Sequence, residues 1–272
     1  MIRVRNAVAS GTVRLAGVSQ SPRLDAELLA AHALGTTREA MLLSHLGDPV
    51  PDSFDALVER RLAHEPVAYI TGSRDFWTIR LEVGPGVLVP RPDSEVLIEA
   101  AEAHFADRAP RALLDLGTGP GTLLLAALDR WPDASGLGVD RSETALGYAR
   151  RNAERLGMAN RASFSTGDWG ADVTGRFDLI LCNPPYIGTD EALPEDVVRF
   201  EPHEALYAGA DGLDAYRRLI PDLRRMLESG GAAVLEIGWR QADAVGALAD
   251  AEGFSVVLHR DLESRPRALV LT

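Results

Sequence analysis

The sequence contains no lysine and a single cysteine, and both shortages restrict what the protein can be. All 28 basic residues are arginine, which we attribute to genome base composition. Cys182 alone cannot form an internal disulfide or a thiolate metal site, and this suits a reducing compartment. The six histidines are never closer than 13 residues and form no His-Glu-x-x-His motif, so we predict no metal site.

Long hydrophobic runs are also missing. The longest uninterrupted aliphatic stretch, residues 123–128, is far shorter than the roughly 20 residues needed to cross a bilayer. The first residues show neither the apolar segment nor the cleavage signal of a leader peptide. We therefore expect a cytoplasmic protein with no membrane partner.

Positive charge is in deficit. The chain has 40 acidic and 28 basic residues, which gives a formal net charge of -12 at pH 7. This balance argues against a protein that binds nucleic acid over its whole surface, so we expect no direct nucleic-acid partner. With 272 residues, of which 46% are hydrophobic and 25% charged, the chain is typical of a globular protein with one large or two ordinary domains. We predict a monomer.

The first 75 residues have the pattern of short helices, because apolar residues recur at spacings of three and four. Three helix starts are predicted by capping residues: Ser21 with Pro22, Thr36 with Glu39, and Asp52 or Ser53. Residues 77–83 then alternate between apolar and polar, and residues 84–86 form a Gly-Pro-Gly turn ahead of residues 87–89. We predict a helical domain over residues 1–75 and a β-hairpin linker over residues 76–90.

From residue 91 onward, strand and helix patterns alternate. Strands are predicted at residues 112–116, 137–139, 162–165, 177–182, 232–237, 254–258 and 268–271. Helices are predicted from residue 93 and at residues 122–131, 142–156, 213–227 and 242–251. Alternation of this kind implies a mostly parallel sheet with helices on both faces, so the predicted class is α/β and the third domain covers residues 91–272.

A glycine-rich turn follows the first of these strands. It consists of Asp115, Leu116, Gly117, Thr118, Gly119, Pro120 and Gly121. Glycines let the backbone turn sharply and approach a ligand, and the helix that follows offers free N–H groups. Gly119 and Gly121 are two residues apart where a dinucleotide fingerprint needs three, and Pro120 lacks an N–H, so the loop does not favour a pyrophosphate. A tight turn without a ligand is the alternative.

Polar side chains also follow the next strands. Asp140 lies 25 residues after Asp115 and can accept hydrogen bonds from ribose hydroxyls, although it can equally cap the next helix. Asp168 and Trp169 can recognise an adenine ring, but a solvated aspartate and a half-buried tryptophan are equally ordinary. Because the carboxyl ends of parallel strands share one edge of a sheet, we expect these residues and Asn183 to line one ligand site.

The sequence Asn183-Pro184-Pro185-Tyr186 follows the strand at residues 177–182 directly. The two prolines fix the backbone and remove N–H donors, which leaves nearby carbonyls able to accept from a ligand's NH2 group. Asn183 adds a side-chain oxygen as acceptor, and Tyr186 adds a flat face. Such a pocket suits a planar amide or aromatic amine, whose nitrogen is a poor nucleophile. A rigid turn that only ends the strand is the alternative.

These motifs resemble those of known methyltransferases. The glycine loop with Asp140 is similar to the S-adenosylmethionine site of class I methyltransferases, and residues 183–186 resemble the substrate motif of enzymes that methylate adenine nitrogens and glutamine amides. Nearly the whole chain resembles the HemK-type release-factor glutamine methyltransferases. The similar segments are residues 65–72, 75–76, 90–95, 115–121, 183–186, 201–202, 205–206 and 212–214. Pro120 stands where that family more often has serine.

The resemblance implies a fold, a reaction and a partner. The implied fold is a small helical domain that docks the substrate, a hairpin linker and a seven-stranded, Rossmann-like methyltransferase domain. The implied reaction transfers the methyl group of S-adenosylmethionine to the side-chain nitrogen (N5) of the glutamine in the Gly-Gly-Gln motif of class I peptide-chain release factors, and leaves S-adenosylhomocysteine.

Two sets of site residues follow from the motifs and the resemblance together. The catalytic set is Asn183, Pro184, Pro185 and Tyr186. The cofactor set is Asp115, Gly117, Thr118, Gly119, Pro120, Gly121, Asp140, Asp168, Trp169 and Asn183.

Two other functions stay open on the sequence. One is an N-methyltransferase that uses the same motif on an adenine amino group or on a ribosomal-protein glutamine. The other is a nucleotide-binding module that has lost transfer activity. The net charge and the lack of a basic cluster argue against a nucleic-acid substrate, and the intact motif at residues 183–186 argues against a module without activity.

Overall fold

The computed structural model describes residues 2–272, so Met1 of the predicted helical domain lies outside the described residues. The chain divides into two compact units. The first unit runs to Ser73 and also contains Leu193–Glu201, and the second contains Arg74–Ala192 and Pro202–Thr272. In residues 2–272 no helix has the length and apolar character that crossing a membrane requires.

The first unit is helical. Its helices are α1 (Val4–Leu15), α2 (Pro22–Leu34), α3 (Arg38–Ala40), the π-helical turn η1 (Met41–His45), α4 (Ser53–Leu62), α5 (Val67–Thr71) and, from the later segment, α9 (Glu195–Phe200). Leu29, Met41 and Phe54 are among the residues buried in its core. The apolar spacing of three and four therefore reflects one shared core, as expected for short helices that cannot be stable alone.

Two of the three predicted helix starts are confirmed, because α2 begins at Pro22 and α4 at Ser53. The third prediction is wrong by one residue. Thr37, and not Thr36, caps α3, where its hydroxyl accepts a hydrogen bond from the N–H of Ala40 at 3.2 Å. The capping-box spacing of Thr36 and Glu39 favoured Thr36, but Thr37 is chemically an equivalent cap and is the one used.

The predicted hairpin exists but lies earlier in the chain. Its strands are β1 (Ser73–Phe76) and β2 (Ile79–Glu82), and the turn consists of Trp77 and Thr78. The predicted strand at residues 87–89 is wrong, since these residues form no strand. Trp77 adopts the left-handed conformation at φ 54°, which is uncommon for a bulky residue, so residue type did not reveal the turn.

The second unit is built on a seven-stranded sheet, which confirms the predicted α/β class. The strands are β3 (Ala112–Leu116), β4 (Ser135–Asp140), β5 (Ala162–Thr166), β6 (Phe177–Cys182), β7 (Leu227–Glu236), β8 (Val256–Arg260) and β9 (Pro266–Leu271). Their order is β5-β4-β3-β6-β7-β9-β8, in which the first five are parallel and β9 is antiparallel to both neighbours. The strand order reverses between β3 and β6, which is where open α/β sheets bind ligands.

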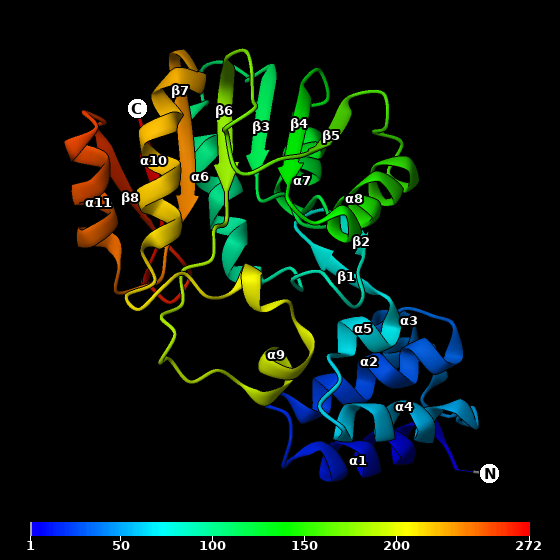
Figure 1. Cartoon of the computed structure of the whole chain (residues 1–272). Helices are drawn as coiled ribbons and strands as arrows, with labels where there is room; N and C mark the ends of the chain where they lie inside the picture. Colours follow the sequence, from blue (N-terminus) through cyan, green and yellow to red (C-terminus); the bar gives the residue numbers. More distant parts are fainter. Residues whose placement is uncertain (1) are drawn as a thin grey trace. The chain divides into compact units, whose positions relative to one another are not determined.

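Helices cover both faces of this sheet (Figure 1). One face carries α6 (Val96–His104), which follows the 3-10 turn η2 (Pro92–Glu95), together with α7 (Thr122–Arg130) and α8 (Glu143–Arg155). The other face carries α10 (Asp214–Met226) and α11 (Ala242–Ala251). The central strands are therefore buried on both sides, and this explains why β3 and β6 are apolar apart from Asp115 and Asp178.

Candidate active site

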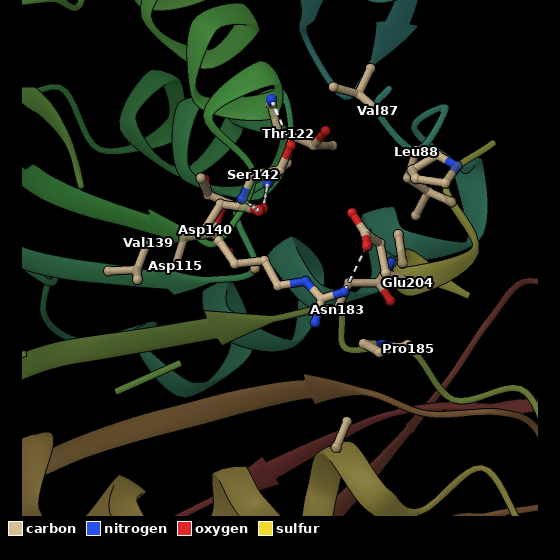
Figure 2. A pocket seen from close by; sticks show the side chains of 18 of the residues that line it. Val87, Leu88, Asp115, Thr122, Val139, Asp140, Ser142, Asn183, Pro185 and Glu204 are labelled. Carbon is tan, nitrogen blue, oxygen red and sulfur yellow. Dashed lines mark hydrogen bonds and ion pairs between the residues drawn. The ribbon is translucent and has the colours of Figure 1, made fainter. Parts of the chain in front are cut away.

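A cavity of about 350 Å³ opens at the carboxyl ends of the central strands of the second unit. In Figure 2, Asp115, Asp140 and Ser142 lie on one side of it, and Asn183 and Pro185 lie on another. Most of the predicted site residues line it: Asp115, Gly117, Thr118, Gly119, Pro120, Asp140, Asp168, Trp169, Asn183 and Pro185. Gly121, Pro184 and Tyr186 belong to the same two segments but are not among the lining residues.

The glycine loop is held in shape by its own N–H groups. The N–H groups of Gly117 and Thr118 both donate to the carbonyl of Val139, at 2.8 and 3.0 Å. The N–H of Gly119 donates to Oδ2 of Asp140 at 2.8 Å. These bonds tie the loop after β3 to the end of β4, so the loop shapes the cavity wall and does not point these three donors at a ligand.

Asp115 is the penultimate residue of β3 and a buried carboxylate that is 1% exposed. Its Oδ2 accepts hydrogen bonds from the hydroxyl of Thr118 at 2.7 Å and from the N–H of Leu124 at 3.2 Å. Its Oδ1 has no hydrogen-bond partner within residues 2–272. Burial raises the pKa of Asp115 to about 7, against the effect of these two hydrogen bonds. The carboxylate therefore has an acceptor left for a ligand with a positive or donating group.

Asp140 ends β4 and lines the cavity through its carboxylate. Oδ1 accepts from the N–H of Ser142 at 2.9 Å, while Oδ2 holds Gly119. Each oxygen keeps a second lone pair that a ligand hydroxyl can use. The alternative that Asp140 caps α8 is wrong, because Ser142 is the cap and accepts from the N–H of Ala145 at 3.2 Å.

Asp168 and Trp169 follow β5, beside the glycine loop. Trp169 has φ 54°, and its ring lies so close to Gly117 that a Cβ there would be 3.4 Å from the ring. Asp168 is ion-paired with Arg218 of α10, which also lines the cavity. The sequence contained no signal for Arg218, since its partner is 50 residues away. The recognition of adenine by these side chains stays a prediction.

Asn183 directs its amide nitrogen into the protein. Nδ2 donates to Oγ of Ser94 at 3.1 Å, and Ser94 is 3% exposed. No described residue bonds to the other amide atom, Oδ1, so this oxygen is the acceptor that Asn183 can offer to a ligand. Pro185 lines the cavity next to it, whereas Pro184 is buried.

Tyr186 turns away from the cavity toward the core. Its hydroxyl donates to Oε1 of Glu236 at 3.2 Å, and its carbonyl accepts from Nε2 of Gln241 at 2.9 Å. The predicted contact of its ring face with a substrate stays a prediction. Sequence reasoning missed Glu236 and Ser94. The signal for Glu236 was a single charged residue in the otherwise apolar run at residues 232–237, which predicts a buried partner.

A further ion pair at the cavity comes from segments far apart in the sequence. Arg141, after β4, donates to Glu204 at 2.9 Å, and Glu204 belongs to the 3-10 turn η3 (His203–Ala205) (Figure 2). Among the described residues no group of three His, Cys, Asp or Glu side chains is placed to hold a metal ion. Cys182 is fully buried, and burial raises the pKa of its thiol, which disfavours the reactive thiolate.

Solved structures with a similar fold are methyltransferases. A methyltransferase from Pyrococcus furiosus aligns with 70% of this chain and 87% of its own at a TM-score of 0.54 and 20% identity. The ribosomal protein L11 methylase from Lactobacillus delbrueckii subsp. bulgaricus aligns with 67% of this chain and 79% of its own at a TM-score of 0.51 and 21% identity. Identities this low show the fold alone. The fold of the second unit is therefore that of the Rossmann-like methyltransferases.

Sequence comparison narrows this class to one family. Residues 6–72 match the PrmC N-terminal domain, and residues 92–200 match the methyltransferase small domain. The release factor glutamine methyltransferase of Rhodospirillum rubrum is 43% identical over 95% of this chain and 81% of its own length. The protein of the same name from Escherichia coli is 41% identical over 84% of this chain and 83% of its own length. The chain belongs to the release factor glutamine methyltransferase family, and the predicted resemblance is confirmed.

Proposed function

We propose that the protein transfers the methyl group of S-adenosylmethionine to the N5 side-chain nitrogen of the glutamine in the Gly-Gly-Gln motif of class I release factors. The observation that carries this proposal is the orientation of Asn183 at the cavity. Ser94, which also lines the cavity, accepts a hydrogen bond from its Nδ2, so Oδ1 is left as an acceptor for an NH2 group. Family membership supplies the substrate class, because the named relatives are release factor glutamine methyltransferases.

The residues of the cavity fit S-adenosylmethionine. Asp115 keeps one buried oxygen without a partner in the described chain, which suits a cationic amino group. Asp140 keeps lone pairs that ribose hydroxyls can use. In this proposal Trp169 and Asp168, which line the same cavity, hold the adenine. The volume of about 350 Å³ falls within the range of about 300–1,000 Å³ that is usual for ligand pockets. When bound there, the cofactor supplies a methyl carbon made electrophilic by its sulfonium group.

The contribution of the protein to the reaction is mainly alignment. The lone pair of an amide nitrogen is conjugated with its carbonyl, so the nitrogen is a weak nucleophile. In this proposal Oδ1 of Asn183 and the carbonyl of Pro184 accept hydrogen bonds from the two N–H groups of the glutamine amide. These bonds orient its nitrogen toward the methyl carbon. Effective molarities of about 10^5 to 10^8 M for well-aligned groups show how much alignment can supply. The methylated nitrogen is acidic and loses its extra proton afterwards.

The domain organisation remains part of the proposal. We assign residues 1–75 to a helical domain that docks the release factor, residues 76–90 to a linker and residues 91–272 to the methyltransferase domain, apart from Leu193–Glu201, which belongs to the first compact unit. The match of residues 6–72 to the PrmC N-terminal domain supports the first of these assignments. We further propose a cytoplasmic monomer that acts on the release factor without binding nucleic acid directly.

A methyl-transfer assay with labelled S-adenosylmethionine tests the proposal. A class I release factor should take up label, and a release factor whose motif glutamine is replaced by alanine should not. Label in RNA or in a ribosomal protein, or label in none of these substrates, would overturn the proposed function.

The role of Asn183 is tested in the same assay. Asn183→Ala should lower turnover by about 10²- to 10³-fold, as is typical when one positioned hydrogen-bonding group is lost from an active site. Cofactor affinity, measured by calorimetry, should change much less. The matched control is Asn160→Ala, since Asn160 is exposed and lies outside the cavity. Near-normal turnover of Asn183→Ala would refute the assigned role.

A further inference from the structure

Glu236 is a buried carboxylate that the mechanism above does not use. It lies at the end of β7, between the apolar strands β6 and β9, and is 1% exposed. Its Oε2 has no hydrogen-bond partner in the described part of the chain. A buried carboxylate with an unsatisfied oxygen is costly, so its position needs an explanation.

Hydrogen bonds connect Glu236 to the cavity. The hydroxyl of Tyr186 donates to Oε1 of Glu236 at 3.2 Å. The hydroxyl of Ser94 is hydrogen-bonded to the same carboxylate. Ser94 in turn accepts from Nδ2 of Asn183 at 3.1 Å. A continuous path therefore leads from a buried charge to the amide that faces the ligand.

The charge of Glu236 decides the direction of every bond along this path. An ionised carboxylate can only accept hydrogen bonds, so the single hydroxyl proton of Ser94 points to Glu236. Ser94 then has only lone pairs to offer Asn183, which must turn its Nδ2 inward and its Oδ1 outward. The opposite amide orientation would place an NH2 group against the NH2 group of a glutamine substrate.

We propose that Glu236 is a positioning residue which, acting through Ser94, fixes the amide of Asn183 with its oxygen toward the substrate nitrogen. This inference rests on the proposed function, because it assumes that a carboxamide NH2 group is the ligand of Asn183. It assigns to the end of β7 a part in substrate alignment, although Glu236 itself touches neither substrate nor cofactor.

Protonation of Glu236 would remove this constraint. A protonated carboxyl can donate to Ser94, which can then donate to Oδ1 of Asn183 and allow the amide to reverse. Burial raises the pKa of Glu236 to about 7, against the hydrogen bonds from Ser94 and Tyr186 and the positive charge of Arg267. Turnover should therefore rise with pH through the neutral range.

Glu236 is the group of this cluster whose pKa is raised into the neutral range. The groups that face it are Arg267 on β9, Asp93 and Ser94 in η2, Cys182 on β6, Tyr186 after β6 and Tyr216 on α10. Burial raises the pKa values of the thiol and of both phenols, and Arg267 has a raised pKa as well. Asp93 is half exposed and ion-paired with Arg267 at 3.0 Å.

The first variant to measure is Glu236→Gln, which keeps the shape of the side chain but replaces a carboxylate that can only accept by an amide that can present either its oxygen or its NH2 group to Ser94. We expect kcat on the release factor to fall by about 10- to 100-fold at pH 8, while the Kd for S-adenosylhomocysteine stays within about twofold. The rise of kcat through neutral pH should become shallower, since only the titration of Asp115, whose pKa burial also raises to about 7, then remains at the cavity. The matched control is Asp178→Asn, the same exchange at the opposite end of the sheet, where Asp178 accepts from the N–H groups of Arg111 and Ala112. It should keep the wild-type pH profile.

Two further variants separate positioning from folding. Ser94→Ala breaks the path without changing the charge and should lower kcat to a similar extent. In the Ser94→Ala background, Glu236→Gln should then lower kcat by less than about threefold, because the effects of coupled residues are not additive. Glu236→Asp keeps the charge and should retain a pH-dependent kcat. If Glu236→Gln does not fold, Ser94→Ala and Glu236→Asp carry the test.

The outcomes distinguish this inference from the function on which it rests. If the wild-type protein does not label the release factor, the proposed function is wrong and the inference is lost with it. If the wild type is active and Glu236→Gln has the same kcat and pH profile, only the inference is overturned. The same holds if folded Glu236→Gln loses cofactor binding in proportion to its activity, since that would show a merely structural role.

Discussion

At the scale of single residues, Asp115 and Glu236 have pKa values raised by burial, whereas hydrogen bonds lower the pKa values of Asp178 and Asp261. The two raised groups are 1% exposed and lie at the carboxyl-terminal ends of β3 and β7, Asp115 as the penultimate residue and Glu236 as the last. Buried carboxylates destabilise a fold when ionised, and perturbed pKa values are concentrated at functional sites. Their positions fit a site that sacrifices stability for the ability to hold a ligand.

The cost of Glu236 can be measured as a pH dependence of stability. Its folded-state pKa of about 7 lies above the unfolded value of 4.5, so its stabilising effect is complete below 4.5 and is lost as pH rises through 7. The side chain of Glu236→Gln does not titrate, so the variant does not lose this stabilisation as pH rises. The free energy of unfolding of the variant, minus that of the wild type, should therefore increase by about 2–3 kcal/mol between pH 5 and pH 8.

Urea unfolding of both proteins at several pH values measures this difference. Asp178→Asn serves as the comparison, because hydrogen bonds lower the pKa of Asp178 and its stabilising effect is lost only toward acid pH. A difference between Glu236→Gln and the wild type that stays constant from pH 5 to pH 8 would contradict the prediction.

At the scale of elements, the turn from β3 to α7 depends on Gly121. Gly121 has φ 86° and directly precedes α7, and it is buried instead of lining the cavity. A Cβ at this position would lie 2.8 Å from Cδ1 of Leu125. The glycine is therefore explained by backbone conformation and by close packing of the loop on the helix.

Gly121→Ala should destabilise the protein by about 1–3 kcal/mol, because the new Cβ meets both a left-handed backbone and Leu125. The matched control is Gly147→Ala in α8, where a Cβ meets nothing closer than Arg151 at 3.6 Å. That variant should be stabilised by about 0.5–1 kcal/mol, since alanine is the better helix former. Thermal or urea unfolding checks both, and an equal effect of the two substitutions would rule out the conformational explanation.

Several elements were predictable at both ends, and two strands are longer than predicted for the same reason. β3, β6 and α11 begin and end where the apolar pattern placed them. β4 and β7 are longer than predicted, since pairing continues through Ser135 and from Leu227, where the flanking residues are polar or glycine. Ladder hydrogen bonds use the backbone, so strand pairing extends past the apolar side chains that reveal a strand in the sequence.

At the scale of the whole molecule, the first unit is formed from two separate segments. Arg61 is buried and is ion-paired with Asp25 at 2.8 Å and with Asp196 at 3.2 Å. Asp196 belongs to the later segment of that unit, more than 130 residues along the chain. A single arginine thus holds helices of the N-terminal part together with α9.

Arg61→Met should destabilise the first unit by about 3–5 kcal/mol, because it leaves the largely buried carboxylate of Asp25 without its partner. Unfolding should then occur in two transitions, with binding of S-adenosylhomocysteine retained through the first. Circular dichroism during urea unfolding, with calorimetry of the ligand, measures both. Arg14→Met is the control, since Arg14 pairs with exposed carboxylates on α4. If ligand binding is lost in the same transition as the first loss of helical signal, the two units do not unfold independently and the prediction is wrong.

The sequence by itself determined the class of fold and much of the candidate site. Strands buried on both faces must be apolar throughout, so their ends could be read directly. The polar residues at those ends, Asp115, Asp140, Asp168 and Asn183, do line one cavity, because parallel strands bring their carboxyl ends to one edge.

Only the tertiary structure decided which side chains stand behind that site. Ser94 contacts Asn183 across 89 residues, and Glu236 and Arg218 come from still later segments. Strand order and helix packing create these contacts, and neither leaves a periodic signal around the residues involved. The pattern of apolar residues therefore revealed where a ligand can bind, whereas the hydrogen bonds that orient the binding groups depend on chain segments that meet only in the folded protein.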